Sequence, residues 1–358
     1  MRVVICGDFL FSSRGLAKRI DPKIVELLQS ADAVFANAEF STPKWDTPPG
    51  FTMYLTSVPQ NRLDEFVDLN IKLVCFANNH TVDYGWLGAQ QTLEAALERD
   101  LVPCGLGRNL DDARKPRFLD TPAGRIGVVT ASTTWPDKGL ASNGNADVVA
   151  RPGLSPLRWK RTIVLPEADF KKLRQISKKL GLEDSNAEVS RIECWPAADE
   201  SHFIFGFPME EKIPVELGET AEVREDVNEE DQAALLRSVA DARKRSDFVL
   251  VNVHTHEGEN ENWYGVNPPK FLIDYAHAAI DAGADVVAYH GAHCSRGGEI
   301  YKGKPIFYNM GSLVMEFETG ESMISPEMYK TYHHPVDALP SDLHTARAKN
   351  PDGSWNGF

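Results

Sequence analysis

The stretch Asp285-Val-Val-Ala-Tyr-His290-Gly-Ala-His293 decides the fold that we expect for this chain. Its apolar run from Val286 to Tyr289 follows a segment with helical periodicity and is typical of a buried strand. Two histidines stand at the carboxyl end of this strand, where ligands gather in open α/β sheets. Imidazoles at such a place serve as metal ligands, acid/base groups or anion partners. Structural histidines that only form hydrogen bonds in the core are the alternative.

Four other short apolar runs end in polar side chains in the same way. Each run predicts a buried strand, and the segments between them have helical periodicity, which together indicate an α/β protein with buried sheets. Loops at the carboxyl ends of such strands converge, so we expect these side chains to lie at one place. The strand at 3–6 precedes Asp8, the strand at 33–36 precedes Glu39, the strand at 72–76 precedes Asn79 and His80, and the strand at 248–253 precedes His254, His256 and Glu257.

The α/β pattern lapses between about residues 135 and 228 and resumes afterwards. This segment contains prolines, charged patches, one expected helix at 168–180 and a β-like run at 202–207. We therefore expect a single domain over residues 1–317, with an inserted cap region at about 135–228. Residues 318–358 are polar and contain prolines, which is typical of a C-terminal tail that wraps over a domain.

Composition excludes some classes of partner. The chain has 38 lysines and arginines against 52 acidic residues, a formal charge of −14, which argues against nucleic acid or an anionic membrane surface. Its five cysteines are scattered and odd in number, which suits a reducing compartment. No run reaches the ~18 apolar residues of a membrane span, and the opening residues read as a strand. We expect a cytoplasmic protein without a membrane partner, and the oligomeric state stays open.

Carboxylates mixed with imidazoles favour Zn, Mn or Fe ions. Each residue alone has a simpler explanation: Asp8 could cap a helix, Asn79 could sit in a turn, and Glu39 or His256 could be exposed. Their coincidence at five strand ends favours a divalent metal site with one or two ions. Two ions would activate a water molecule as a nucleophile near neutral pH.

The polar motifs also occur in a recognisable order. They are Gly7-Asp8, Asn37-Ala-Glu39, Ala77-Asn78-Asn79-His80, His254-Thr-His256-Glu257-Gly258, His290-Gly-Ala-His293 and Asn309-Met-Gly311-Ser. This ordered set resembles the CapA family, named for poly-γ-glutamate capsule synthesis proteins and similar to calcineurin-like metallophosphoesterases. The resemblance covers about residues 1–135 and 230–317. It implies a calcineurin-like four-layer α/β/β/α sandwich.

The resemblance also implies a role for each motif residue. Asp8 would bind the first metal ion and Glu39 would bridge two ions. Asn79 and His254 would bind the second ion, while His290 and His293 would complete the two shells. His80 would act as the general acid near the leaving group.

One departure from the phosphoesterase pattern concerns the first ion. Leu10 stands where those enzymes have a histidine, so this ion lacks a ligand unless His256 or Glu257 supplies it. A site with a single ion is therefore also open. Arg296, three residues beyond His293, could clamp a carboxylate or phosphate of the substrate, or form a surface salt bridge. The candidate catalytic residues are thus His80, His256 and Arg296.

The function that we expect is metal-dependent hydrolysis. The capsule connection favours an amide bond in a γ-glutamyl or peptide-like substrate, and the phosphoesterase resemblance keeps a phosphoester open. The partner would be a small-molecule or peptide-like substrate, with anionic substrates among the options. Two alternatives are a non-hydrolytic acid/base enzyme on the same fold, like a peptide epimerase, and a polymer-binding protein of capsule biosynthesis.

Overall fold

The computed structural model describes residues 1–50, 55–136, 138–210, 212–316, 324–335, 337–347, 349–350 and 352–355. Its chain forms two compact units. The first contains Met1–Leu157, Glu230–Pro268 and Leu272–Phe358, and the second contains Arg158–Glu229 with Pro269–Phe271. The second unit thus begins later than the insertion that we expected from about residue 135. Residues 318–323 of the expected tail lie outside the described residues.

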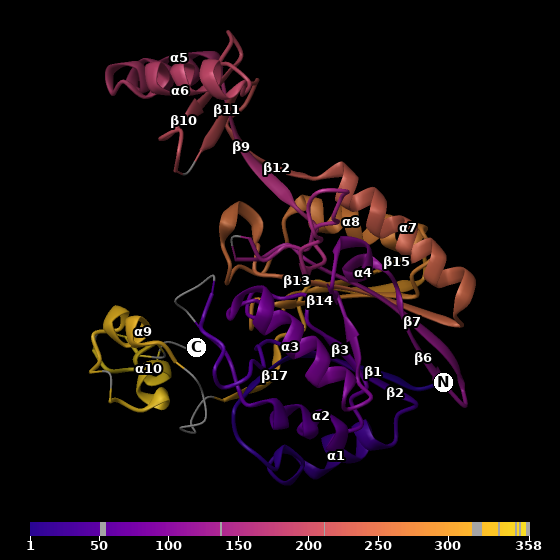
Figure 1. The fold of residues 1–358 in the computed structure, drawn as a ribbon. Helices are drawn as coiled ribbons and strands as arrows, with labels where there is room; N and C mark the ends of the chain where they lie inside the picture. The colour runs from indigo at the N-terminus through magenta and orange to yellow at the C-terminus, as the bar shows by residue number, and fades with distance from the viewer. Residues whose placement is uncertain are drawn as a thin grey trace. The chain divides into compact units, whose positions relative to one another are not determined.

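The first sheet of the first unit is entirely parallel (Figure 1). It places the strand at 312–316 beside the strand that opens the chain. All residues of its central strands β2 and β3 are buried, which explains why both are continuous apolar or small-residue runs. The strand order is β17 (Ser312–Glu316), β1 (Val3–Phe11), β2 (Ala33–Ala38), β3 (Leu73–Cys75) and β4 (Val102–Cys104).

The second sheet has a parallel centre and antiparallel edges. Its register pairs His254 of one strand with His290 of the next, so the two imidazoles leave the sheet side by side. The strand order is β15 (Gly298–Tyr301), β16 (Lys304–Phe307), β14 (Val286–Gly291), β13 (Phe248–Thr255), β7 (Gly124–Ser132) and β6 (Arg117–Thr121).

The two sheets pack face to face through one apolar core. Phe35, Leu73 and Cys75 of the first sheet share this core with Leu250 and Ala288 of the second. Burial of these side chains stabilises the contact by roughly 25 cal/mol for each Å² removed from water. The outer face of the first sheet packs on the helices α1 (Pro22–Gln29), α2 (Asp64–Asp68) and α3 (Gly85–Leu97).

The outer face of the second sheet is covered by the helices α7 (Glu229–Arg245) and α8 (Lys270–Asp281). The Tyr289 hydroxyl of β14 donates to the Leu272 carbonyl of α8 at 2.9 Å. A Cβ on Gly127 of β7 would lie 3.2 Å from the Ala242 side chain of α7. The first unit therefore has the expected α/β/β/α layers, and the prediction of an α/β sandwich is confirmed.

The second unit is a small α/β structure with its own core of Phe170, Phe203 and Val215. The expected helix and β-like run are present as α5 and β10. The helix α6 was not expected, and Leu182 is its buried residue. The sheet order is β10 (His202–Phe205), β11 (Ile213–Leu217), β9 (Trp159–Leu165) and β12 (Glu222–Val227), beside α5 (Glu167–Lys179) and α6 (Leu182–Glu193).

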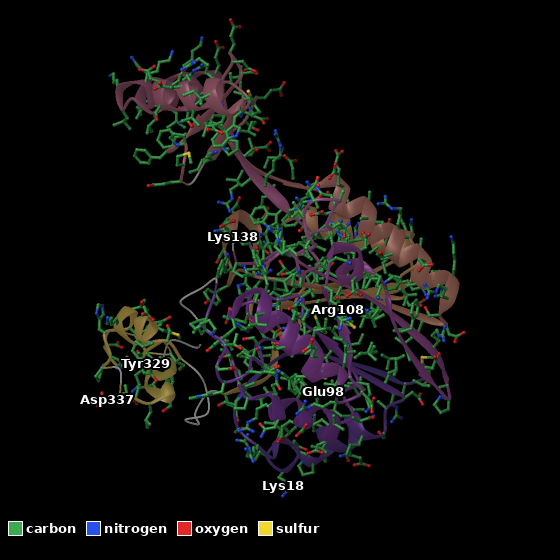
Figure 2. The ribbon with its side chains drawn as sticks, viewed as in Figure 1. Lys18, Glu98, Arg108, Lys138, Tyr329 and Asp337 are labelled. Carbon is green, nitrogen blue, oxygen red and sulfur yellow. The ribbon has the colours of Figure 1, made fainter. Side chains whose placement is uncertain are left out.

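The remaining elements are short: α4 (Leu110–Arg114), α9 (Pro326–Thr331), α10 (Pro340–Arg347) and the paired strands β5 (Leu106–Gly107) and β8 (Gly153–Leu154). Within the described ranges, none of the helices has the length and apolar character that crossing a bilayer requires. Charged side chains such as Lys18, Glu98 and Arg108 are exposed (Figure 2). Against that background, the fully buried carboxylates of Asp8 and Glu39 are exceptional.

Candidate metal centre

The strand β1 carries Asp8 into the centre of the protein. The Asp8 amide donates to the Gly311 carbonyl at 3.0 Å, and the register of β1 with both neighbouring strands shifts around Asp8. A Cβ on the preceding Gly7 would lie 1.8 Å from the same Gly311 oxygen, so only glycine permits this close approach. The Gly7-Asp8 pair therefore has a physical reason: the first residue allows the backbone contact that places the second.

A first group of potential ligands consists of Asp8, His254 and His290. The Asp8 Oδ1 lies 2.9 Å from His290 Nδ1, and the Nδ1 atoms of His254 and His290 are 3.1 Å apart. One ligand atom from each of the three residues lies within 4.8 Å of the others, and all three residues are buried. An oxygen and two imidazole nitrogens at this spacing are a suitable donor set for a divalent ion.

A second group consists of Glu39, His256 and His293. Glu39 Oε1 lies 3.5 Å from His293 Nε2 and 3.8 Å from His256 Nε2. His293 adopts the left-handed region at φ 55°, which is uncommon for a residue with a side chain and typical of functional sites. Because His293 Nδ1 also lies 3.4 Å from Asp8 Oδ2, the two groups adjoin and form one centre.

Two atoms of the second group have no hydrogen-bond partner among the described residues. They are Glu39 Oε1 and His256 Nε2, and both are buried. A buried polar atom without a partner costs free energy, and natural proteins retain few of them. A bound cation would satisfy both atoms at once. The donor set, the spacing and these two atoms therefore fit a divalent metal ion.

Burial shifts the pKa values of several candidate ligands. Burial, followed by the charge of Asp8, raises the pKa of Glu39 well above its usual range. Burial would also raise the pKa of Asp8, but hydrogen bonds with His290 and His293 hold it well below its usual range. Burial lowers the pKa of His256 from 6.5 to about 3. The His256 ring is therefore neutral near pH 7 and keeps a lone pair for a metal ion.

Asn79 and His80 follow β3 and take different positions. Asn79 Oδ1 lies 2.8 Å from His254 Nε2, so it reaches the first group through its amide oxygen. His80 Nδ1 lies 2.9 Å from Asp83 Oδ2, which also accepts the Thr56 amide at 2.7 Å. Burial raises the pKa of Asp83 despite its His80 partner. Asp83 thus fixes the orientation of the His80 ring, as a carboxylate does for a catalytic histidine.

Three residues that support the candidate ligands were given no role by the sequence, although two of them stand in the quoted motifs. Asn37 Nδ2 donates to Asp8 Oδ1 at 2.9 Å, and Asn252 Oδ1 lies 2.8 Å from His290 Nε2. The Ser312 hydroxyl lies 3.1 Å from His293 Nδ1. The sequence does hold a signal for the two asparagines, because each interrupts a buried apolar strand. A buried amide there needs partners, and metal-site histidines commonly have such partners behind them.

The metal ligand that we expected to be missing at Leu10 is also missing at this position in the structure. Leu10 is buried and carries no donor atom. Of the two residues that the sequence offered in its place, the structure brings His256 into the second group. Glu257 instead accepts the Thr134 and Thr255 hydroxyls, at 2.9 and 2.7 Å, so its carboxylate is engaged away from this group.

Arg296 differs from both roles that the sequence suggested. Its guanidinium is buried and donates to backbone carbonyls, among them those of Trp263 at 2.7 Å and Gly265 at 3.0 Å. This arrangement is neither a surface salt bridge nor an open clamp for a substrate anion. The expected clamp is corrected on this physical ground: the donors of Arg296 already hold the loop that carries His256.

Comparison with known proteins agrees with the ordered motifs. The family model described as bacterial capsule synthesis protein PGA_cap matches residues 2–316. The uncharacterized protein y4uA of Sinorhizobium fredii (strain NBRC 101917 / NGR234) is 29% identical over 339 residues, which are 92% of this chain and 69% of that protein.

Two further relatives have names that refer to polymer synthesis. The PGA biosynthesis protein CapA of Bacillus subtilis (strain 168) is 24% identical over 285 residues, 78% of this chain and 53% of that protein. A probable polyglutamine synthesis accessory protein of Mycobacterium tuberculosis (strain CDC 1551 / Oshkosh) is 24% identical over 293 residues, 82% of this chain and 56% of that protein. The chain thus spans about half the length of these two relatives.

Among solved structures, a hypothetical protein from Thermus thermophilus aligns with a TM-score of 0.44 and 14% identity, over 95% of this chain and 87% of that one. The family assignment rests instead on the match to residues 2–316, which is nearly the whole sequence. It confirms the resemblance that the motifs predicted. The chain belongs to the bacterial capsule synthesis protein family PGA_cap.

Proposed function

We propose that this protein is a metal-dependent hydrolase that cleaves an amide bond in a γ-glutamyl or peptide-like substrate. The observation that carries the proposal is the pair of adjoining ligand groups, Asp8–His254–His290 and Glu39–His256–His293. The names of the two relatives refer to PGA and polyglutamine, and chains of glutamate or glutamine are joined by amide bonds. A buried centre of this kind also supports phosphoester cleavage, which is the competing substrate class.

Six residues of the two groups would hold one or two divalent ions of Zn, Mn or Fe, with Asn79 beside them. Such ions would supply Lewis-acid activation of a water molecule and of the scissile carbonyl. The neutral imidazole of His256 leaves its ring nitrogen available as a ligand, in keeping with its lowered pKa. Glu39 would exchange its proton for the cation when the centre loads.

His80 would serve as the general acid. As water adds to the carbonyl carbon, the C–N bond breaks and the leaving nitrogen needs a proton, which a protonated His80 can donate. Asp83 would keep the ring oriented through its 2.9 Å contact with Nδ1 and would stabilise the charged ring before the transfer. The chain thus provides a metal centre and an oriented acid on neighbouring strand ends.

The test is reconstitution after chelation. The full chain is stripped of metal and supplied in turn with Mn²⁺, Zn²⁺ or Fe²⁺, and two chromogenic substrates are offered: γ-glutamyl-p-nitroanilide and bis(p-nitrophenyl) phosphate. We expect one of the ions to restore amide cleavage, and His80→Ala to slow it while retaining metal. Restoration of phosphate release alone would reassign the substrate class. No hydrolysis with any ion would contradict the proposal.

One observation favours a second function. Glu39 and His256 face each other at 3.8 Å, the first with a raised pKa and the second with a lowered one. A neutral acid beside a neutral base is suited to moving an α-proton without cleavage, as in a peptide epimerase. Incorporation of deuterium from heavy water into γ-glutamyl peptides that stay intact would favour this function. Retention of such peptides with neither cleavage nor exchange would favour a polymer-binding protein.

A further inference from the structure

The loop that follows β13, residues 256–265, is fastened to Arg296. The guanidinium Nε donates to the Gly265 carbonyl at 3.0 Å and Nη1 donates to the Glu257 carbonyl at 2.5 Å. Nη2 donates to the carbonyls of Trp263 and His256, at 2.7 and 3.2 Å. One buried side chain thus holds both ends of the loop, and we call this segment the Arg296-clamped loop.

The Arg296-clamped loop is also tightened from within. The Gly265 amide donates to the Asn262 carbonyl at 2.9 Å, and the Glu261 amide donates to the Gly258 carbonyl at 2.9 Å. A Cβ on Gly258 would lie 1.9 Å from the Asn262 oxygen, so the chain passes itself closely there. A loop with this many internal bonds has little conformational entropy left to lose when a ligand binds.

Trp263 is the aromatic side chain that this loop presents beside the metal centre. Its ring centroid lies 4.9 Å from that of His256, at an interplanar angle of 67°. His256 is only 8% exposed, whereas Trp263 is 44% exposed. The indole therefore packs edge-to-face with a candidate metal ligand and keeps a large part of its surface open to solvent. The ring thus combines a contact with a candidate metal ligand and an accessible surface.

We propose that Trp263 is a substrate-binding platform that takes an uncharged planar or apolar group next to the cleaved bond, and that Arg296 is the residue that positions this platform. The inference rests on the proposed function, because the platform adjoins the metal ligands. An indole supplies a large apolar contact area, and its electron-rich face does not attract anions. The indole therefore favours a planar or apolar group over an anionic one, even where other parts of the substrate carry negative charge.

The test compares two hydroxamates that bind divalent ions through the same chelating group. Benzohydroxamate carries a planar ring and acetohydroxamate carries only a methyl group. Their dissociation constants are measured on the Mn²⁺-loaded full chain by calorimetry, and metal content is measured by elemental analysis. We expect Trp263→Ala to reduce the preference for benzohydroxamate by about threefold to tenfold without loss of metal. Trp263→Phe should retain most of the preference, because a ring remains.

Two further variants separate the platform from general effects. Trp195→Ala removes an indole of similar exposure, 38%, from the second unit, and should leave the preference unchanged. Arg296→Lys should lose the preference, because one ammonium cannot serve four carbonyls. It should also make the Trp263 part of the fluorescence, taken as the difference from the same chain with Trp263→Phe, more open to quenching by acrylamide.

Each outcome decides a separate question. If the ratio of the two dissociation constants is the same in Trp263→Ala and in the wild type, the proposed role of Trp263 is wrong, and the proposed metal centre is unaffected. If the wild-type chain retains no ion and binds neither hydroxamate, the proposed function fails and the platform fails with it. If Trp195→Ala reduces the preference for benzohydroxamate as much as Trp263→Ala does, the effect is general and the assignment to Trp263 is also wrong.

Discussion

His256 Nε2 lies 3.8 Å from Glu39 Oε1, and neither atom has a hydrogen-bond partner within the described part of the chain. Two facing, buried and unsatisfied atoms are costly in a protein that has no cation between them. The relationship makes His256 the residue whose removal should reveal the second ligand group most clearly.

His256→Ala should lower the number of tightly bound ions, since the group Glu39–His256–His293 loses one of its three donors. We expect a reduction of about tenfold or more in affinity for the weaker ion, or its complete loss from purified protein. Elemental analysis and competition with a chromogenic chelator measure both quantities. The control is His202→Ala, a partly buried histidine of the second unit. Equal metal content in wild type and His256→Ala would contradict the role of His256.

Asn252→Leu removes the amide oxygen that lies 2.8 Å from His290 Nε2. The ring would lose the partner that fixes its orientation, so metal affinity should fall about tenfold to a hundredfold. Chelator competition measures the affinity, and circular dichroism verifies that the fold persists. An affinity equal to that of the wild type would show that His290 needs no support from β13.

His80→Ala should reduce kcat by about 10²- to 10⁴-fold, because the leaving nitrogen would depart without a positioned acid. The loss should be smaller for a p-nitroanilide than for an alkyl amide, since p-nitroaniline leaves more easily. Steady-state kinetics on the two substrates give the comparison, and metal content should not change. A loss of equal size on both substrates would argue against proton donation by His80.

The stability of the metal-free protein should fall as pH decreases from about 6.5 towards 3, in part because of His256. Burial lowers its folded-state pKa from 6.5 to about 3. In that window the unfolded imidazole binds a proton that the folded one does not, so acid favours unfolding. His256→Gln should show a shallower decrease, measured by urea unfolding at pH 7 and pH 5. The difference between the two proteins isolates this residue from Glu39, whose raised pKa acts in the opposite direction.

Gly7→Ala should destabilise the protein by about 3 kcal/mol or more, because its Cβ would meet the Gly311 carbonyl oxygen at 1.8 Å. Gly297→Ala is the matched control, since a Cβ there meets nothing within 4 Å. Thermal and urea unfolding measure both variants. A Gly7→Ala protein as stable as the control would mean that β1 and β17 can separate at little cost.

Much of the fold could be predicted because its central strands are buried on both faces. Strands such as β2 and β13 are buried runs, each interrupted by a single asparagine, without the alternation of half-exposed strands, and polar residues mark where they end. The strand β17 was not expected, because its apolar run extends only from Leu313 to Met315. The helix α6 likewise buries little, with Leu182 as its buried residue. Short or weakly buried elements have weak hydrophobic patterns in the sequence, so they are harder to predict.

The members of the candidate site were visible in the sequence, but their grouping was not. His254 was expected beside Asn79 on a second ion, and the structure places it between Asn79 and the pair Asp8–His290. That placement depends on the register of β13 with β14 and on the left-handed backbone conformation of His293. The sequence pattern predicts neither of them. The role predicted for Arg296 was wrong because its partners are backbone carbonyls. Every residue has a backbone carbonyl, so no sequence pattern identifies these partners.

The pairing of β17 with β1 joins Asp8 to Ser312. During synthesis Asp8 is made about three hundred residues before the strand that pairs with it at Ser312. A partly made chain therefore has its acidic ligand and lacks both the neighbouring strand and His293. The candidate metal centre would therefore be complete only after Ser312 has been made, and before that point the chain would lack a settled place for an ion beside Asp8.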